Sequence, residues 1–68
     1  MKPLTAREVE AYLKAAGYVY DHTEGSHFIW RNDEKRHTVP VPHHGNKSLK
    51  QGTLNGIFNA CGIEKPKR

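Results

Sequence analysis

The spacing of apolar residues changes at Gly17, and this change limits what the chain can fold into. Before Gly17, apolar residues recur at the i, i+3, i+4, i+7 positions of an amphipathic helix. After it, short runs of β-branched and aromatic residues alternate with polar turn residues, as in β-strands. The helical residues are Val9, Tyr12, Leu13 and Ala16. The chain therefore combines helix with sheet.

We predict that the first helix spans residues 5–16. Thr5 and Glu8 have the spacing of a capping box, in which each residue satisfies a backbone N–H of the other. Gly17 can adopt the left-handed conformation that commonly ends a helix. The helix thus has a signal at both of its ends.

Three strands are expected after the helix, separated by polar turns at residues 24–26 and 32–35. The strands are expected at residues 18–20, 27–31 and 36–41. Turns this short give an antiparallel meander, and Pro40 predicts that the third strand lies at a sheet edge or bends. The apolar run 28–30 has no gap, so the pattern leaves open which face carries His27. Within it, Trp30 is expected in the core rather than as a platform for stacking bases.

A polar, basic loop over residues 42–52 leads into a second helix. Its apolar face consists of Leu54, Ile57, Phe58 and Cys61, and it is expected to close at Gly62-Ile63. Because glycine inside a helix costs about 1 kcal/mol relative to alanine, Gly56 predicts close packing against the sheet. The element order predicts an α+β fold, α-β-β-β-α, with two helices covering one face of a three-stranded antiparallel sheet.

A chain of 68 residues has room for one domain. We predict a single domain over residues 1–63 and a flexible basic tail over residues 64–68. So short a chain buries only about 60% of its unfolded surface, so binding to a partner would stabilise it. The lone Cys61 excludes an internal disulfide. With neither a membrane-spanning run nor a signal-peptide segment, the sequence predicts a cytoplasmic protein.

Positive charge is concentrated in the second half of the chain. Residues 1–34 carry four Lys or Arg and six Asp or Glu, a balance of 4 − 6 = −2. Residues 35–68 carry seven and one, a balance of 7 − 1 = +6, so the chain totals +4. This asymmetry favours a polyanionic partner, for which nucleic acid is the usual candidate. A charged half that only keeps the protein soluble is the alternative.

The five histidines of the chain raise the alternative of a metal site. Zinc sites use three or four His, Cys or carboxylate ligands at defined spacings. His22 and His27 are separated by a turn that can bring them to one ion, but no pair of cysteines accompanies them. The sequence therefore favours a site without metal.

Three stretches of the chain together resemble the HicA family of toxins. They are Gly25-Ser26-His27, the loop Val-Pro-His-His-Gly-Asn-Lys-Ser-Leu-Lys at residues 41–50, and Gly52-Thr53-Leu54 leading to Ala60-Cys61-Gly62-Ile63. Their order, their spacing and the chain length match the family over nearly the whole chain. Two positions depart from its pattern. Phe28 stands where some relatives have a second histidine, and a His43-His44 pair replaces a single histidine, matched by His44.

The resemblance implies a fold like the double-stranded-RNA-binding domain and an mRNA-cleaving toxin inhibited by a HicB-type antitoxin. It implies no cofactor, and it assigns catalysis to His27, which matches the histidine of the family's Gly-Ser-His motif. RNA cleavage needs a base, an acid and cations for the phosphoryl oxygens. We therefore expect His27 to act as general acid or base. The residues expected to bind RNA are Arg36, His44, Lys47 and Lys50.

Two other functions fit the sequence. A non-catalytic double-stranded-RNA-binding module would use basic residues at the start of the second helix for phosphate and 2′-hydroxyl contacts. Such a module has no need for the histidine of the Gly-Ser-His turn. A protein-interaction domain would instead use the acid-free region to attract an acidic partner. Cleavage of RNA without added metal separates the enzyme from both alternatives.

Overall fold

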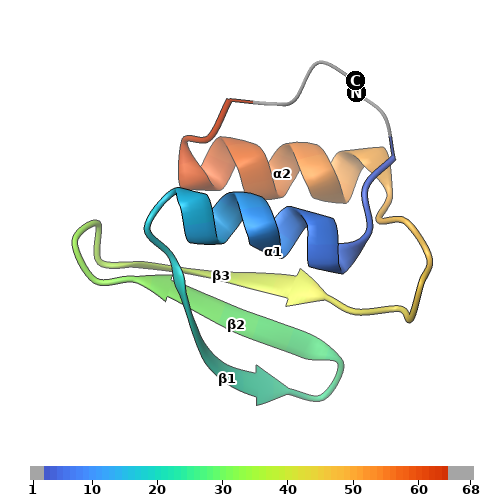
Figure 1. The fold of residues 1–68 in the computed structure, drawn as a ribbon, viewed down its shortest axis with the longest axis horizontal. Helices are drawn as coiled ribbons and strands as arrows, with labels where there is room; N and C mark the ends of the chain where they lie inside the picture. The colour runs from blue at the N-terminus through green and yellow to red at the C-terminus, as the bar shows by residue number, and fades with distance from the viewer. Residues whose placement is uncertain (1–2, 65–68) are drawn as a thin grey trace.

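A computed structural model describes residues 3–64 of the chain. Its elements are α1 (Ala6–Ala15), β1 (Val19–Glu24), β2 (His27–Asn32), β3 (His37–Pro42) and α2 (Gln51–Cys61). The strands form one antiparallel sheet in the order β1-β2-β3, and both helices lie on the same face of it (Figure 1). The predicted α+β fold is therefore confirmed. Of the expected tail, residues 65–68 lie outside the described residues.

The first helix begins at the capping box that the sequence predicts. Thr5 Oγ1 accepts the N–H of Glu8 at 3.3 Å, and Glu8 Oε1 accepts the N–H of Thr5 at 2.9 Å. After the helix, Gly17 adopts a φ of 95°, in the region that glycine enters at little cost. The N–H of Tyr18 then donates to the carbonyl of Leu13 at 2.9 Å. These contacts turn the chain from α1 into β1.

The pairing register settles which residues face the helices. Trp30 of β2 pairs with Val39 of β3, and both are buried beneath the helices, so Trp30 belongs to the core as predicted. Because side chains alternate between the two faces of a strand, His27 lies on the opposite, open face. The same face carries Ile29 and Arg31 of β2 and their register partners in β1.

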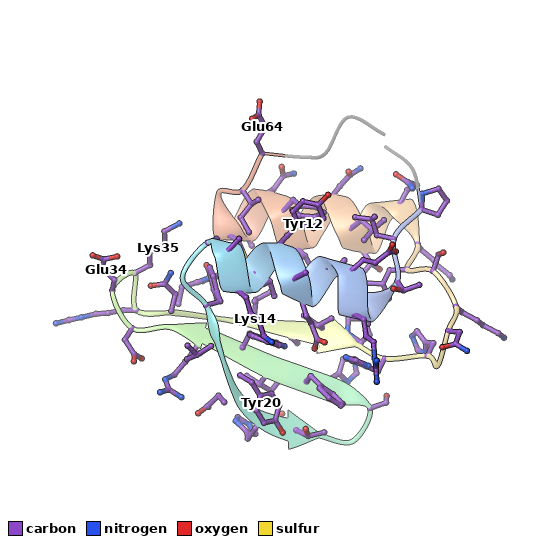
Figure 2. The ribbon with its side chains drawn as sticks, in the orientation of Figure 1. Tyr12, Lys14, Tyr20, Glu34, Lys35 and Glu64 are labelled. Carbon is purple, nitrogen blue, oxygen red and sulfur yellow. The ribbon has the colours of Figure 1, made fainter. Side chains whose placement is uncertain are left out.

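One end of the sheet is fixed to both helices through the turn between β2 and β3. The buried Asn32 accepts the N–H of Lys35 through Oδ1 at 3.0 Å and donates from Nδ2 to the carbonyl of Ala16 at 3.4 Å. Lys35 Nζ donates to the carbonyl of Cys61 at 3.0 Å, at the end of α2. Figure 2 shows Lys35 at this turn. The turn between β1 and β2 and the loop between β3 and α2 lie at the opposite end (Figure 1).

The second helix buries the apolar face that the sequence predicts and ends at Gly62 in the left-handed conformation. It begins at Gln51, inside the segment expected to be loop. The prediction for Gly56 is wrong, because this residue is exposed and a Cβ added there would meet no atom within 4 Å. The 3.6-residue period explains this, since it places position 56 opposite Leu54 and Phe58.

Replacing Gly56 by alanine should therefore stabilise the protein. The added methyl group meets open space, and alanine loses less backbone entropy on folding than glycine. We expect the free energy of unfolding to rise by about 0.5–1 kcal/mol in urea denaturation. Gly62→Ala is the contrasting control, because its φ of 67° strains any residue with a Cβ. A loss of stability in Gly56→Ala would contradict the exposed position of this residue.

Candidate functional site

His27 is the first residue of β2 and follows directly on the two-residue turn Gly25-Ser26. Gly25 has a φ of 60°, which lets the chain reverse within these two residues. His27 is exposed and lies between Glu24 of β1 and Pro42 of β3, its two register partners. The structure thus presents its side chain to solvent from a backbone held on both sides.

The backbone next to His27 depends on a hydrogen bond from beyond the end of β3. His27 and Pro42 form a non-hydrogen-bonded pair of the antiparallel ladder, so the absence of an N–H on Pro42 leaves no bond to β2 unmade. His43 donates its N–H to the carbonyl of Ser26 at 2.8 Å, which completes the antiparallel ladder around the His27–Pro42 pair. The placement of His43 therefore bears directly on the placement of His27.

The side chain of His43 is held from the helix side by Glu10 of α1. His43 Nε2 lies 2.9 Å from Glu10 Oε2, and the same oxygen accepts the Nε1–H of Trp30 at 2.8 Å. The His43 ring stacks on Phe28 with a centroid distance of 3.8 Å and an interplanar angle of 22°. Only 13% of the Glu10 side chain and 21% of the His43 side chain are exposed. We call these four residues the Glu10 network.

The Glu10 network was missed by sequence reasoning, although a signal for part of it was present. Phe28 and His43 are the positions at which the chain departs from the HicA pattern, and the structure stacks these two rings on each other. Phe28 and His43 therefore belong to one structural feature, the stacked pair of rings. Nothing in the sequence points to Glu10, because a carboxylate on a helix is ordinarily a solvated surface group.

Three of the four residues expected to bind RNA line one pocket of about 360 Å³ between β3 and the start of α2. They are His44, Lys47 and Lys50, and the remaining lining residues are Pro42, Ser48, Leu49 and Thr53. Because Pro42 is also the register partner of His27, the pocket adjoins the candidate catalytic residue. Neither lysine takes part in an ion pair within residues 3–64. We call this the basic pocket.

The fourth expected residue, Arg36, is not brought to this pocket. It lies in the turn before β3, beside the Asn32–His37 pair, whereas His27 pairs with Pro42 at the other end of the strands. Five steps along β2 separate the two ends, which is about 17 Å. Arg36 and the basic pocket are therefore two separate positive positions on the molecule.

A row of ion pairs crosses the open face of the sheet and ends beside His27. Arg31 Nη1 lies 2.9 Å from Asp21 Oδ1, and Asp21 Oδ2 lies 2.8 Å from His22 Nδ1. His22 Nε2 in turn lies 2.8 Å from Glu24 Oε2. Hydrogen bonds to Glu24 and Asp21 raise the pKa of His22, and the bond to His22 lowers the pKa of Asp21. His22 is thus held between two carboxylates.

Within residues 3–64 the structure contains neither a cluster of metal ligands nor a membrane-spanning helix. No three His, Cys, Asp or Glu side chains of this part of the chain are grouped as a metal ion would require. No helix of the same part is both long and apolar enough to cross a bilayer.

The fold and this site define a small α+β domain that presents a histidine from a tight turn beside a basic pocket. Comparison with protein families matches residues 6–63 to the HicA toxin of bacterial toxin–antitoxin systems. The chain belongs to the HicA toxin family, so it is a toxin-type protein whose system includes an antitoxin. The match includes both His27 and the basic pocket. A comparison with curated proteins found no match.

Replacing Glu10 by leucine should destabilise the fold. The change removes the acceptor of two side-chain N–H groups, those of Trp30 and His43. We expect a loss of about 1–3 kcal/mol in the free energy of unfolding, measured by denaturant titration. Glu10→Gln keeps an acceptor oxygen and should lose less. Glu34→Leu, at the exposed turn visible in Figure 2, is a matched control. Equal stability of the two leucine variants would show that the Glu10 network contributes nothing.

Proposed function

We propose that this HicA-family toxin is a metal-independent endoribonuclease, an mRNA interferase that uses His27 as a general acid or base. The observation that carries the proposal is the exposed His27 on the fixed Gly25-Ser26 turn, next to the basic pocket. Family membership supports the same activity. We propose further that a HicB-type antitoxin neutralises the protein.

RNA carries its own nucleophile, so this reaction needs no metal. The 2′-oxygen attacks the phosphorus, the bond to the 5′-oxygen breaks, and the product is a 2′,3′-cyclic phosphate with a free 5′-hydroxyl. A base takes the proton of the 2′-hydroxyl and an acid protonates the leaving oxygen. One histidine contributes about 10²–10⁴-fold to such a step, so we expect a slow enzyme.

The basic pocket supplies the positive charge that the reacting phosphate requires. Lys47 and Lys50 bind phosphoryl oxygens, and His44 lies in the same pocket as a further donor. Because Pro42 lines the pocket and is the register partner of His27, a phosphate bound there lies beside His27. Arg36 then binds a phosphate at a distance of about 17 Å along the sheet.

The charge distribution also suits the proposed antitoxin. The described part of the chain has no acidic residue between Lys35 and Ile63, so an acidic surface is attracted to the side that carries the basic pocket. Covering His27 is the simplest route to inhibition. Since mRNA is the proposed substrate, we place this activity in the cytoplasm.

Purified protein should cut a long single-stranded RNA in excess EDTA, whereas His27→Ala should not. Removal of the imidazole leaves no group at this position to transfer a proton, so the rate should fall at least about 10²-fold. Fragment sizes are followed on a gel and the ends are analysed for 2′,3′-cyclic phosphate. Glu34→Gln serves as the active control variant.

Other outcomes of this experiment point to the alternatives. Cleavage that EDTA abolishes would indicate metal catalysis. Binding without any cleavage by the unaltered protein would favour a non-catalytic RNA-binding module. Full cleavage by purified His27→Ala would show that His27 has no catalytic role.

The double variant Lys47→Ala/Lys50→Ala should bind RNA more weakly, with a shallower dependence on salt. Each phosphate contact to a single strand contributes about 0.7 to the slope of log K against log salt. Loss of two contacts should therefore reduce the slope by about 1.4. Fluorescence anisotropy with a labelled oligonucleotide at several salt concentrations measures this. An unchanged slope would show that these lysines do not bind phosphate.

A further inference from the structure

Cleavage of RNA through its 2′-hydroxyl involves two proton transfers, but the Gly-Ser-His motif supplies only one group for them. The register of the β1–β2 hairpin places a second ionisable group next to it. Glu24, the last residue of β1, is the partner of His27, and both side chains are exposed. The turn between them contains only Gly25 and Ser26, so their backbones are fixed relative to each other.

The geometry of this pair suits a carboxylate and an imidazole that act on one phosphodiester. Glu24 and His27 close a two-residue hairpin, and paired residues of this kind have Cα atoms about 5.5 Å apart. Paired residues also point to the same face of a sheet, here the open face. The Glu24 carboxylate and the His27 imidazole can therefore flank a phosphate from two sides.

The Glu24 carboxylate is held in its place by the row of ion pairs on the same face. His22 Nε2 lies 2.8 Å from Glu24 Oε2, and His22 Nδ1 is engaged by Asp21, which is itself paired with Arg31. The raised pKa of His22 keeps this imidazole protonated to a higher pH, so its positive charge stays beside the Glu24 carboxylate. One Glu24 oxygen is engaged by His22, which leaves the other to accept a proton.

We propose that Glu24 is a second catalytic residue, the general base that accepts the proton of the 2′-hydroxyl while protonated His27 acts as the general acid. This inference rests on the proposed ribonuclease function. A carboxylate is the natural proton acceptor near neutral pH, and an imidazolium is the natural donor. Each group thus takes the role that its chemistry favours.

The proton and bond changes of this step balance without any further reactant. The 2′-hydroxyl proton passes to Glu24 as the 2′-oxygen forms its bond to phosphorus. The phosphorus–5′-oxygen bond breaks, and the 5′-oxygen takes the proton of His27. Glu24 is left protonated and His27 neutral, and exchange with water restores both groups before the next turnover.

Glu24→Gln tests the proposal, because it keeps the size of the side chain and removes only its basicity. With a single-stranded RNA substrate in EDTA we expect kcat to fall about 10²-fold, with KM unchanged. Glu34→Gln is the matched control, since Glu34 is also an exposed glutamate but lies in the turn at the other end of the strands (Figure 2). Thermal unfolding of both variants checks that the fold is intact.

An RNA in which sulfur replaces the scissile 5′-oxygen separates the two roles. A thiolate leaves without protonation, because a thiol has a pKa of about 8.5, far below that of an alcohol. The activity of His27→Ala should therefore recover on this substrate, whereas Glu24→Gln should remain slow. Recovery of Glu24→Gln instead would overturn the assignment of the base.

The results also separate the failure of this inference from the failure of the proposed function. If Glu24→Gln keeps its kcat within about threefold while His27→Ala is inactive, the role of Glu24 is overturned and the ribonuclease function stands. If the unaltered protein does not cut RNA, both are overturned. A further readout is the NMR titration of His22, whose pKa should fall toward its ordinary value in Glu24→Gln.

Discussion

The carboxylate of Glu10 is the contact on which the arrangement of the sheet end that carries His27 depends. One oxygen of this side chain joins α1 to Trp30 in the middle of the sheet and to His43 beyond the end of β3. His43 in turn holds the backbone of Ser26, which directly precedes His27. A single charged acceptor with two N–H partners therefore relates the first helix to the residue proposed to transfer a proton. Charge-assisted hydrogen bonds of this kind are stronger than neutral ones, which suits a fold with a small core.

The two ends of the sheet differ in what their residues contact. At one end, Asn32 and Lys35 bond to the last turns of both helices, so the turn between β2 and β3 is fixed from two sides. At the other end lie the Gly25-Ser26 turn, His27 and the basic pocket. His27 and Lys47 are exposed to solvent at this end. The 62 described residues, 3–64, thus combine one sheet end that is hydrogen-bonded to both helices with another that exposes His27 to solvent.

The sequence predicted the elements more fully than their contacts. The capping box, the apolar face of α2 and the element order are local patterns, and the structure confirms them. On the expected apolar face of α1, Val9 and Leu13 are buried but Tyr12 is exposed. The predicted strand at residues 18–20 was too short, since β1 runs to Glu24. All six residues of β1 are exposed, so its sequence has no alternation of buried and exposed residues that would have predicted its full length. The face occupied by His27 required the pairing register. The Glu10 network joins residues up to 33 positions apart, and no local pattern encodes such a contact.

The candidate site could be predicted only in part from the sequence, because local patterns reveal some of its residues and not the contacts between distant ones. His27, His44, Lys47 and Lys50 stand in recognisable stretches, whereas the position of Arg36 at the far turn depends on strand length and pairing. Glu24 carried no signal of its own, because its relation to His27 appears only when the hairpin closes.

The stacking of Phe28 on His43 has a consequence for how such proteins can diverge. A histidine at position 28 would place one imidazole against another, and a proton on either ring would be repelled by a proton on the other. The aromatic carbon ring of Phe28 avoids this conflict and leaves His43 free to pair with Glu10. Replacing only one of Phe28 and His43 would therefore disturb the stacked pair. The two residues should be inherited together, and they should be transferred together when the site is grafted onto another scaffold.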